Sequence, residues 1–135
     1  MPGYLLDTNI LSDLIKHPAG AAARRIGLAG EEAVCTSIVV ACELRYGAAK
    51  KGSPRLTGKI EQLLSAIEIL PLEQDADLKY GEIRCALEKT GKTIGANDLM
   101  IAAHALAEEL TLVTDNVAEF SRVTGLRIEN WLEPI

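Results

Sequence analysis

The stretch Gly3-Tyr4-Leu5-Leu6-Asp7-Thr8-Asn9 joins a short apolar run to the start of a helix. Residues 3–6 are predicted to form a buried strand, and Thr8 and Asn9 can cap a helix that runs to about Lys16. The same alternation continues along the chain. Further strands are predicted near 33–36, 69–72, 112–114 and 127–129, and further helices near 21–28, 38–50, 54–68, 75–89 and 97–110. Strands that alternate with helices indicate an α/β fold whose parallel sheet is covered on both faces.

The length and composition point to one globular domain, which we predict to cover residues 1–135. Aromatic residues make up only 4% of the chain, which predicts an aliphatic core and argues against a protein that stacks nucleic-acid bases. No apolar run is long enough to cross a membrane, and no basic segment precedes the first one. With three cysteines and no Cys-x-x-Cys pair, we expect reduced thiols in a cytoplasmic protein.

Carboxylates occupy positions where an α/β fold places functional groups. Asp7 and Asp115 each follow a predicted strand directly, and sites in parallel sheets form beyond the carboxyl ends of the strands. Asp98 begins the helix predicted to be capped by Asn97. A simpler interpretation for each aspartate is turn or helix-cap chemistry.

Glu43 is harder to explain by structure alone, because it lies in an otherwise apolar helical run. No cation lies three or four residues away on either side, so no local salt bridge can form. An unpaired buried carboxylate is costly, so Glu43 either faces water or meets a cation from elsewhere. A metal ion is a natural candidate for that cation.

Together these carboxylates predict a site for a hard cation. Oxygen ligands of this kind select Mg²⁺ or Mn²⁺, and only His17 and His104 are available for a site that would need histidine. One or two such ions can activate water for phosphodiester hydrolysis. The net charge of −5 argues against a protein that coats nucleic acid, but it is compatible with a nuclease.

The order and spacing of four segments resemble the PIN-domain ribonucleases, most of all the VapC-type toxins of bacterial toxin–antitoxin pairs. The segments cover residues 5–11, 37–47, 97–105 and 112–116. The resemblance implies a three-layer α/β/α sandwich around a parallel sheet of about five short strands. It also implies a Mg²⁺-dependent endoribonuclease, usually dimeric, that cuts transfer or ribosomal RNA.

The resemblance also assigns roles to residues. Asp7, Glu43 and Asp98 match the three best-defined acidic positions of the family, as catalytic residues and metal ligands. The fourth position falls within Thr114-Asp115-Asn116-Val117-Ala118-Glu119-Phe120, where we prefer Asp115 and keep Asn116 and Glu119 as rivals. Thr8 and Thr114 would place hydroxyl groups beside the metal, where they orient ligands or water.

Residues 44–60 hold five basic residues and no acidic one, which indicates either a solvated helix end or a surface that contacts RNA phosphates. The candidates are Arg45, Lys50, Lys51, Arg55 and Lys59. By resemblance, a VapB-type antitoxin would lay a segment into the cleft, with an Arg or Lys on the carboxylates, in a hetero-oligomer. A homodimer would use part of the apolar surface formed by Leu56, Ile60, Leu63, Leu64 and Ile67.

Two other function classes remain open at the level of sequence. One is a catalytically silent module that keeps the fold and binds a partner. The other is a phosphoryl-transfer protein that uses Asp7 as nucleophile. The haloacid-dehalogenase type of phosphatase requires a second aspartate two positions later, where this chain has Asn9.

Overall fold

Five parallel strands form the centre of the protein, for which the computed structural model describes residues 2–133. The strand order is β3-β2-β1-β4-β5, so β1 lies in the middle of the sheet. Leu5 pairs with Cys35 on one side and with Leu112 on the other. The strands are β1 (Tyr4–Leu6), β2 (Val34–Ser37), β3 (Glu68–Leu70), β4 (Thr111–Val113) and β5 (Ile128–Glu129).

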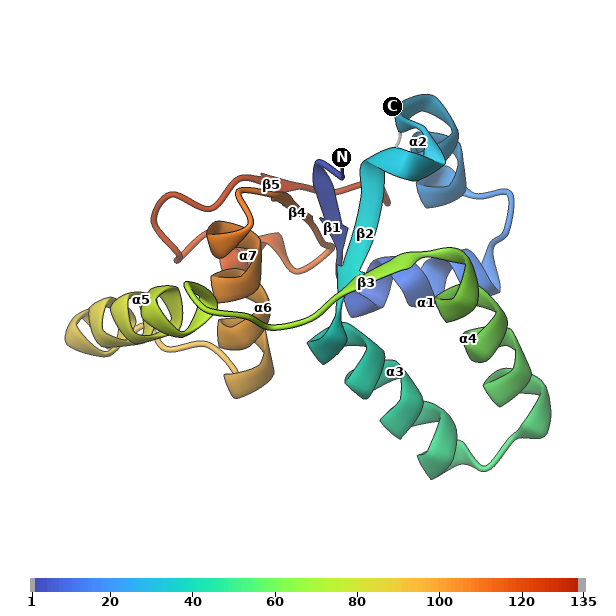
Figure 1. Cartoon of the computed structure of the whole chain (residues 1–135), viewed down its shortest axis with the longest axis horizontal. Helices are drawn as coiled ribbons and strands as arrows, with labels where there is room; N and C mark the ends of the chain where they lie inside the picture. The colour runs from blue at the N-terminus through green and yellow to red at the C-terminus, as the bar shows by residue number, and fades with distance from the viewer. Residues whose placement is uncertain (1, 134–135) are drawn as a thin grey trace.

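Helices cover both sides of this sheet, and α1 and α4 lie on the opposite side from α5 and α6 (Figure 1). This arrangement confirms the predicted α/β sandwich with its parallel sheet. The helices are α1 (Thr8–Lys16), α2 (Ala21–Ala29), α3 (Ile38–Lys51), α4 (Pro54–Ala66), α5 (Ala76–Thr90), α6 (Ala96–Ala107) and α7 (Val117–Phe120), with a 3₁₀ turn η1 (Glu31–Ala33).

Two predicted helix caps were wrong. The cap of α1 is Asp7, whose side chain accepts a hydrogen bond from the amide of Thr8, instead of Thr8 and Asn9. The cap of α6 is Gly95, which places Asn97 inside the first turn with its side chain turned to Glu43. Both differences bring polar side chains to the carboxyl end of β1, where the carboxylates lie.

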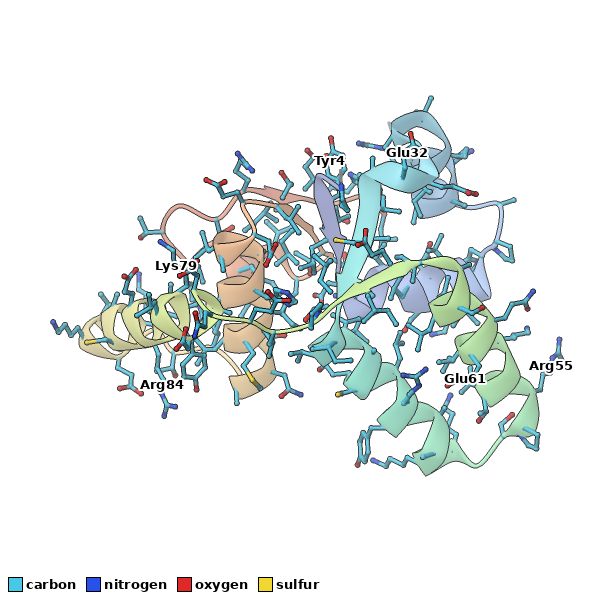
Figure 2. The ribbon with its side chains drawn as sticks, viewed as in Figure 1. Tyr4, Glu32, Arg55, Glu61, Lys79 and Arg84 are labelled. Atoms are coloured by element: carbon cyan, nitrogen blue, oxygen red, sulfur yellow. The ribbon has the colours of Figure 1, made fainter. Side chains whose placement is uncertain are left out.

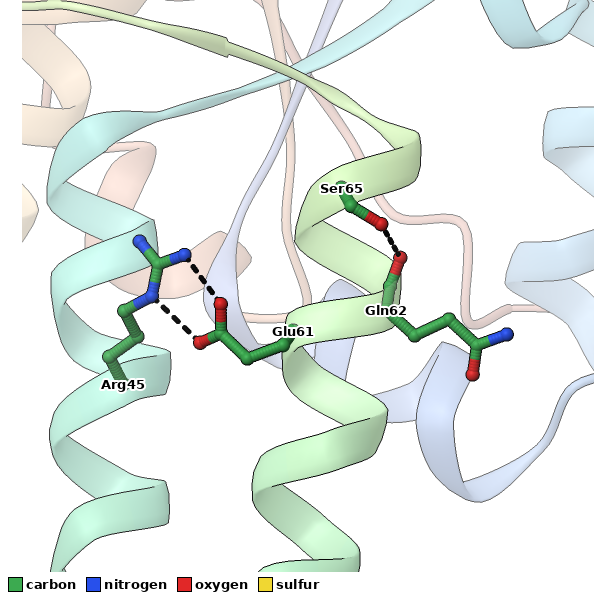
Figure 3. Close-up of polar contacts among 4 residues, drawn as sticks. All are labelled: Arg45, Glu61, Gln62 and Ser65. Atoms are coloured by element: carbon green, nitrogen blue, oxygen red, sulfur yellow. Dashed lines mark hydrogen bonds and ion pairs between the residues drawn. The ribbon is translucent and has the colours of Figure 1, made fainter.

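Helices α3 and α4 form a hairpin that extends away from the sheet (Figure 1). Gly52 ends α3 at a φ of 64°, a left-handed conformation that glycine adopts without strain. Arg45 of α3 and Glu61 of α4 tie the two helices through a pair of 2.9 Å hydrogen bonds (Figure 3). This contact lowers the pKa of Glu61 because the guanidinium favours the charged carboxylate.

The apolar surface of α4 packs largely against the rest of the protein. Ile60 and Leu64 are buried in the core, and Leu56, Leu63 and Ile67 are partly buried against it. The surface predicted for a homodimer is therefore mostly used within the chain. Exposed large apolar side chains lie elsewhere, notably Tyr46 on α3 and Leu78 on α5.

The core is aliphatic, as the composition predicts, with Phe120 and Trp131 as its buried aromatic members at the carboxyl-terminal side. Helix α6 contributes a run of small and apolar residues, of which Ile101, Ala102 and Ala105 are fully buried. Within residues 2–133, no helix combines the length and the apolar composition needed to cross a bilayer.

The three cysteines differ in burial, and we expect them to differ in reactivity for that reason. Cys35 is fully buried in β2, and burial raises the pKa of its thiol to about 12, whereas Cys42 and Cys85 are exposed. Because the thiolate is the reactive form, an alkylating reagent at neutral pH should modify Cys42 and Cys85 and spare Cys35. Mass spectrometry of native protein should show two modifications, and denatured protein should show three. Rapid modification of Cys35 in native protein would contradict this placement.

Candidate active site

Asp7 lies at the carboxyl end of the central strand, where it is 4% exposed. Its Oδ1 accepts from the amide of Thr8 at 2.8 Å, and its Oδ2 accepts from the hydroxyl of Thr114 at 2.7 Å. The Asn9 amide adds a longer contact to Oδ2 at 3.3 Å. Burial raises the pKa of Asp7 and outweighs these hydrogen bonds, and repulsion from Glu43 acts in the same direction as burial. Asp7 is thus held in one orientation in a place that disfavours its charge.

Glu43 reaches the same place from the middle of α3. Its Oε1 accepts from the hydroxyl of Thr8 at 2.6 Å, and its Oε2 accepts from the side-chain amide of Asn97 at 3.5 Å. In the described part of the chain, Glu43 forms no salt bridge with a lysine or arginine. Glu43 is half-buried, and in the described chain these two neutral donors satisfy it; a cation from outside the chain stays a prediction for this carboxylate.

Asp98, in the first turn of α6, faces Glu119 of α7. The two side chains share a hydrogen bond, and the pKa of Asp98 is raised to about 7 by burial, then by Glu119, Asp7 and Glu43. The pKa of Glu119 is lowered, first by a hydrogen bond from the amide of Gly95 at 3.0 Å. The side-chain amide of Asn116 also donates to Glu119, at 2.6 Å. Burial and neighbouring carboxylates thus favour the protonated form of Asp98, whereas the donors to Glu119 favour its charged form.

Asp115, the preferred fourth carboxylate, makes its contacts elsewhere. Its amide donates to Asn9 at 2.9 Å, and its carboxylate accepts from Asn130 at 3.3 Å on the carboxyl-terminal side of β5. Among the described residues, the carboxylates that act on Asp98 are Glu119, Asp7 and Glu43. The structure thus brings Asp7, Glu43, Asp98 and Glu119 together and favours Glu119 over Asp115.

The residues of this cluster fit a hard cation by their chemistry. They supply carboxylate, hydroxyl and amide oxygens, and their mutual repulsion is what a divalent cation relieves. Within residues 2–133, no three metal-ligating side chains already converge on one point.

Known proteins are similar to this chain in sequence and in fold. The PIN domain family matches residues 4–126. The chain belongs to the PIN-domain family. It is 42% identical to Ribonuclease VapC2 of Rickettsia felis over 95% of this chain and 97% of that protein. It is 40% identical to the tRNA(fMet)-specific endonuclease VapC of Shigella flexneri, over 95% and 97% of the two chains.

Solved structures agree with this assignment. A chain of DNA-bound VapBC from Salmonella typhimurium superimposes with a TM-score of 0.91 at 36% identity, over 97% of this chain and 99% of that chain. A chain of the Rickettsia felis VapBC2 complex with promoter DNA gives a TM-score of 0.88 at 38% identity, over 95% and 98% of the chains. The resemblance of this PIN domain to VapC-type nucleases is confirmed. The roles of its individual residues stay predictions.

The raised pKa of Asp98 predicts how stability depends on pH without metal. Between the ordinary pKa of 3.8 and about 7, the folded protein binds more protons at Asp98 than the unfolded chain does. The free energy of unfolding should therefore fall as pH rises through this window. Asp7 acts in the same sense, whereas the lowered pKa of Glu119 acts oppositely, near its ordinary value of 4.5.

Asp98→Asn should flatten this decline above pH 4.5, because asparagine has no proton to lose. Asp115→Asn serves as the matched control and should leave the slope as it is. Urea unfolding of metal-free protein at several pH values measures both. An unchanged slope in Asp98→Asn would show that Asp98 is not under this repulsion.

Proposed function

We propose that this PIN domain is a Mg²⁺-dependent endoribonuclease, with Mn²⁺ as a substitute, that acts as the toxin of a toxin–antitoxin pair. The observation that carries the proposal is that Asp7 and Glu43 both lie near enough to Asp98 to raise its pKa, while no lysine or arginine pairs with Glu43 in the described chain. Relatives at 42% and 40% identity are named as a ribonuclease and a tRNA(fMet)-specific endonuclease. Transfer RNA is therefore the first substrate class to test, and ribosomal RNA is the second.

In this proposal Asp7, Glu43 and Asp98 hold one or two ions, with Glu119 or Asp115 as the fourth carboxylate. A bound Mg²⁺ supplies an activated water and offsets the charge that develops on the phosphate. The chain's own groups orient the ligands. The Thr114 hydroxyl donates to Asp7, and it accepts from the backbone N–H of Asn116 at 3.0 Å. The Thr8 hydroxyl donates to Glu43.

The proposed RNA path runs from this site along the α3–α4 hairpin. A groove of about 250 Å³ is lined by Thr8 and Glu43 as well as by Lys16 and Lys51. Four of the predicted phosphate contacts, Lys50, Lys51, Arg55 and Lys59, have no salt bridge in the described residues, and Arg55 projects away from the hairpin (Figure 2). Arg45 is engaged by Glu61 and is the weakest of the five candidates.

The proposed restraint on this activity is a VapB-type antitoxin in a hetero-oligomer. Three similar solved structures are of VapBC, two of them bound to DNA. The same groove has apolar lining from Leu44, Leu56 and Ile60 beside Glu43. This lining suits an amphipathic antitoxin segment that ends in an Arg or Lys on the carboxylates. Toxin and antitoxin would meet in the cytoplasm, where the RNA substrate lies.

We also propose a homodimer, for which α4 can contribute the partly buried side chains of Leu56, Leu63 and Ile67. The exposed apolar side chains of Ile38, Tyr46, Leu72 and Leu78 are available for it, whereas Ile60 and Leu64 are buried within the chain.

Asp7→Asn tests the catalytic proposal with little disturbance of the fold. Asparagine is as good a helix cap as aspartate, so α1 should keep its start, but the negative charge is lost. RNA cleavage should fall by about 10²–10³-fold, the scale of one lost electrostatic group. Wild-type protein should lose cleavage in excess EDTA and regain it with Mg²⁺ or Mn²⁺. Full cleavage in EDTA would contradict the metal mechanism.

The pair Glu119→Gln and Asp115→Asn identifies the fourth carboxylate within the same assay. Glu119→Gln should reduce cleavage strongly if Glu119 completes the site, and Asp115→Asn should then retain most of it. The reverse pattern would restore Asp115 to the fourth position. Transfer RNA with mapped 5′ ends provides the readout, and complete absence of cleavage by wild type would favour a catalytically silent module.

Glu43→Gln separates catalysis from folding. Glutamine keeps the shape of the side chain and can still accept from Thr8, but it removes one of the repelling charges. The thermal midpoint of metal-free protein should stay the same or rise, while cleavage falls by orders of magnitude. A structural ion pair would instead make the change destabilising by about 3 kcal/mol or more. A large drop in midpoint with cleavage retained would assign Glu43 to structure.

A further inference from the structure

His104 makes a buried contact that the proposed chemistry does not use. It lies on α6, fully buried, with its Nδ1 2.8 Å from the hydroxyl oxygen of Ser37, which is also fully buried. Ser37 ends β2 and caps α3, because its hydroxyl oxygen accepts from the amide of Val39 at 3.1 Å. The contact therefore joins α6 to the first turn of the helix that carries Glu43.

We propose that His104 is a positioning residue for the cation site: through Ser37 it fixes α3 against α6 and so sets Glu43 relative to Asp98. The inference rests on the proposed function, because it concerns the geometry of the proposed cation ligands. It adds a residue that lies within the core and outside the carboxylate cluster.

The two helices are joined at two points, which makes such control possible. At the buried point His104 meets Ser37, and at the site the amide of Asn97 lies 3.5 Å from Glu43. Asn97 and His104 are seven residues apart on α6, which is about two helical turns, so they lie on one face. Two contacts on one face hold the rotation of α3 as well as its distance from α6.

Stability alone gives little reason for a histidine at this position. Its buried Nε2 lies close enough to the Pro71 carbonyl for that carbonyl to raise its pKa, but the two groups do not reach good hydrogen-bond geometry. Burial dominates and lowers that pKa, so the ring is neutral. A buried polar atom that lacks a well-placed partner is unfavourable. An apolar side chain would fill the space without this penalty, so the Ser37 contact is what the histidine adds.

The cation site is sensitive to such positioning because it is not already assembled. Within residues 2–133, no three ligating side chains converge on one point. Binding must therefore select a particular placement of Glu43 and Asp98, and a shift of α3 against α6 changes the affinity. Groups that orient metal ligands typically alter metal affinity by about 10–100-fold when they are removed.

The test compares His104 variants by Mn²⁺ affinity and by thermal midpoint. His104→Leu fills a similar volume and removes the contact with Ser37. His104→Asn places an amide near the position of Nδ1, whereas His104→Gln extends beyond it. Electron paramagnetic resonance of free Mn²⁺ gives the affinity of metal-free full-length protein, and calorimetry gives the midpoint in the absence of metal.

We expect His104→Leu to weaken Mn²⁺ binding about tenfold with an unchanged or higher midpoint, and His104→Asn to bind more tightly than His104→Gln. In a Ser37→Ala background, His104→Leu should cause no further loss of affinity. Wild-type affinity in His104→Leu, or a lower midpoint with unchanged affinity, would overturn the inference and leave the proposed function standing. If His104→Leu does not fold, equal affinities of the Asn and Gln variants would overturn it. Failure of the wild type to bind Mn²⁺ would instead overturn the metal site itself, and this inference with it.

Discussion

Mutual repulsion among carboxylates at the end of β1 is the constraint on which the rest of the site depends. Asp98 has its pKa raised to about 7 by burial and by three neighbouring carboxylates, and Asp7 is 4% exposed. A chain of marginal stability holds such groups together only where other contacts fix them. Here those contacts are hydroxyls and amides, among them Thr114 on Asp7 and Gly95 on Glu119. They orient the carboxylates but bring no positive charge to them.

The helices differ in how far they stabilise the negative charge of their carboxylates. Asp7 caps α1 and Asp98 lies in the first turn of α6, so both sit where the helix dipole favours a negative charge. Glu43 lies in the middle of α3 and gains nothing from a helix end. Its placement depends on Thr8, on Asn97 and on the way α3 is held against α6. The position of Glu43 is therefore more sensitive to small shifts of α3 than the positions of Asp7 and Asp98 are.

Sequence reasoning found what local pattern determines and missed what distant contacts determine. The strands and the positions of Asp7, Glu43 and Asp98 follow from alternating apolar runs and from strand ends, so they were predictable. Asp115 is the carboxylate that the strand-end rule singles out, whereas Glu119 lies on α7, which spans only four residues and leaves little periodic pattern in the sequence. That turn carries Glu119 back to Gly95, 24 residues earlier in the chain. Likewise, the count of free cations from Leu44 to Ile60 included Arg45, because its partner Glu61 lies one residue beyond that window.

Because Arg45 pairs with Glu61, the unpaired basic side chains of the hairpin lie apart from the carboxylates. By pairing Arg45 with Glu61 the hairpin gains a fixed geometry, since a bidentate pair specifies orientation as well as distance. The cations that remain free lie nearer the tip, at Lys50, Lys51, Arg55 and Lys59, whereas the carboxylates lie at the base of α3 and at the strand ends. An RNA backbone would be attracted by the tip and repelled by the base until a cation occupies the carboxylates. In the proposed function, the tip of the α3–α4 hairpin thus attracts the substrate, whereas cleavage takes place at the carboxylates near the strand ends.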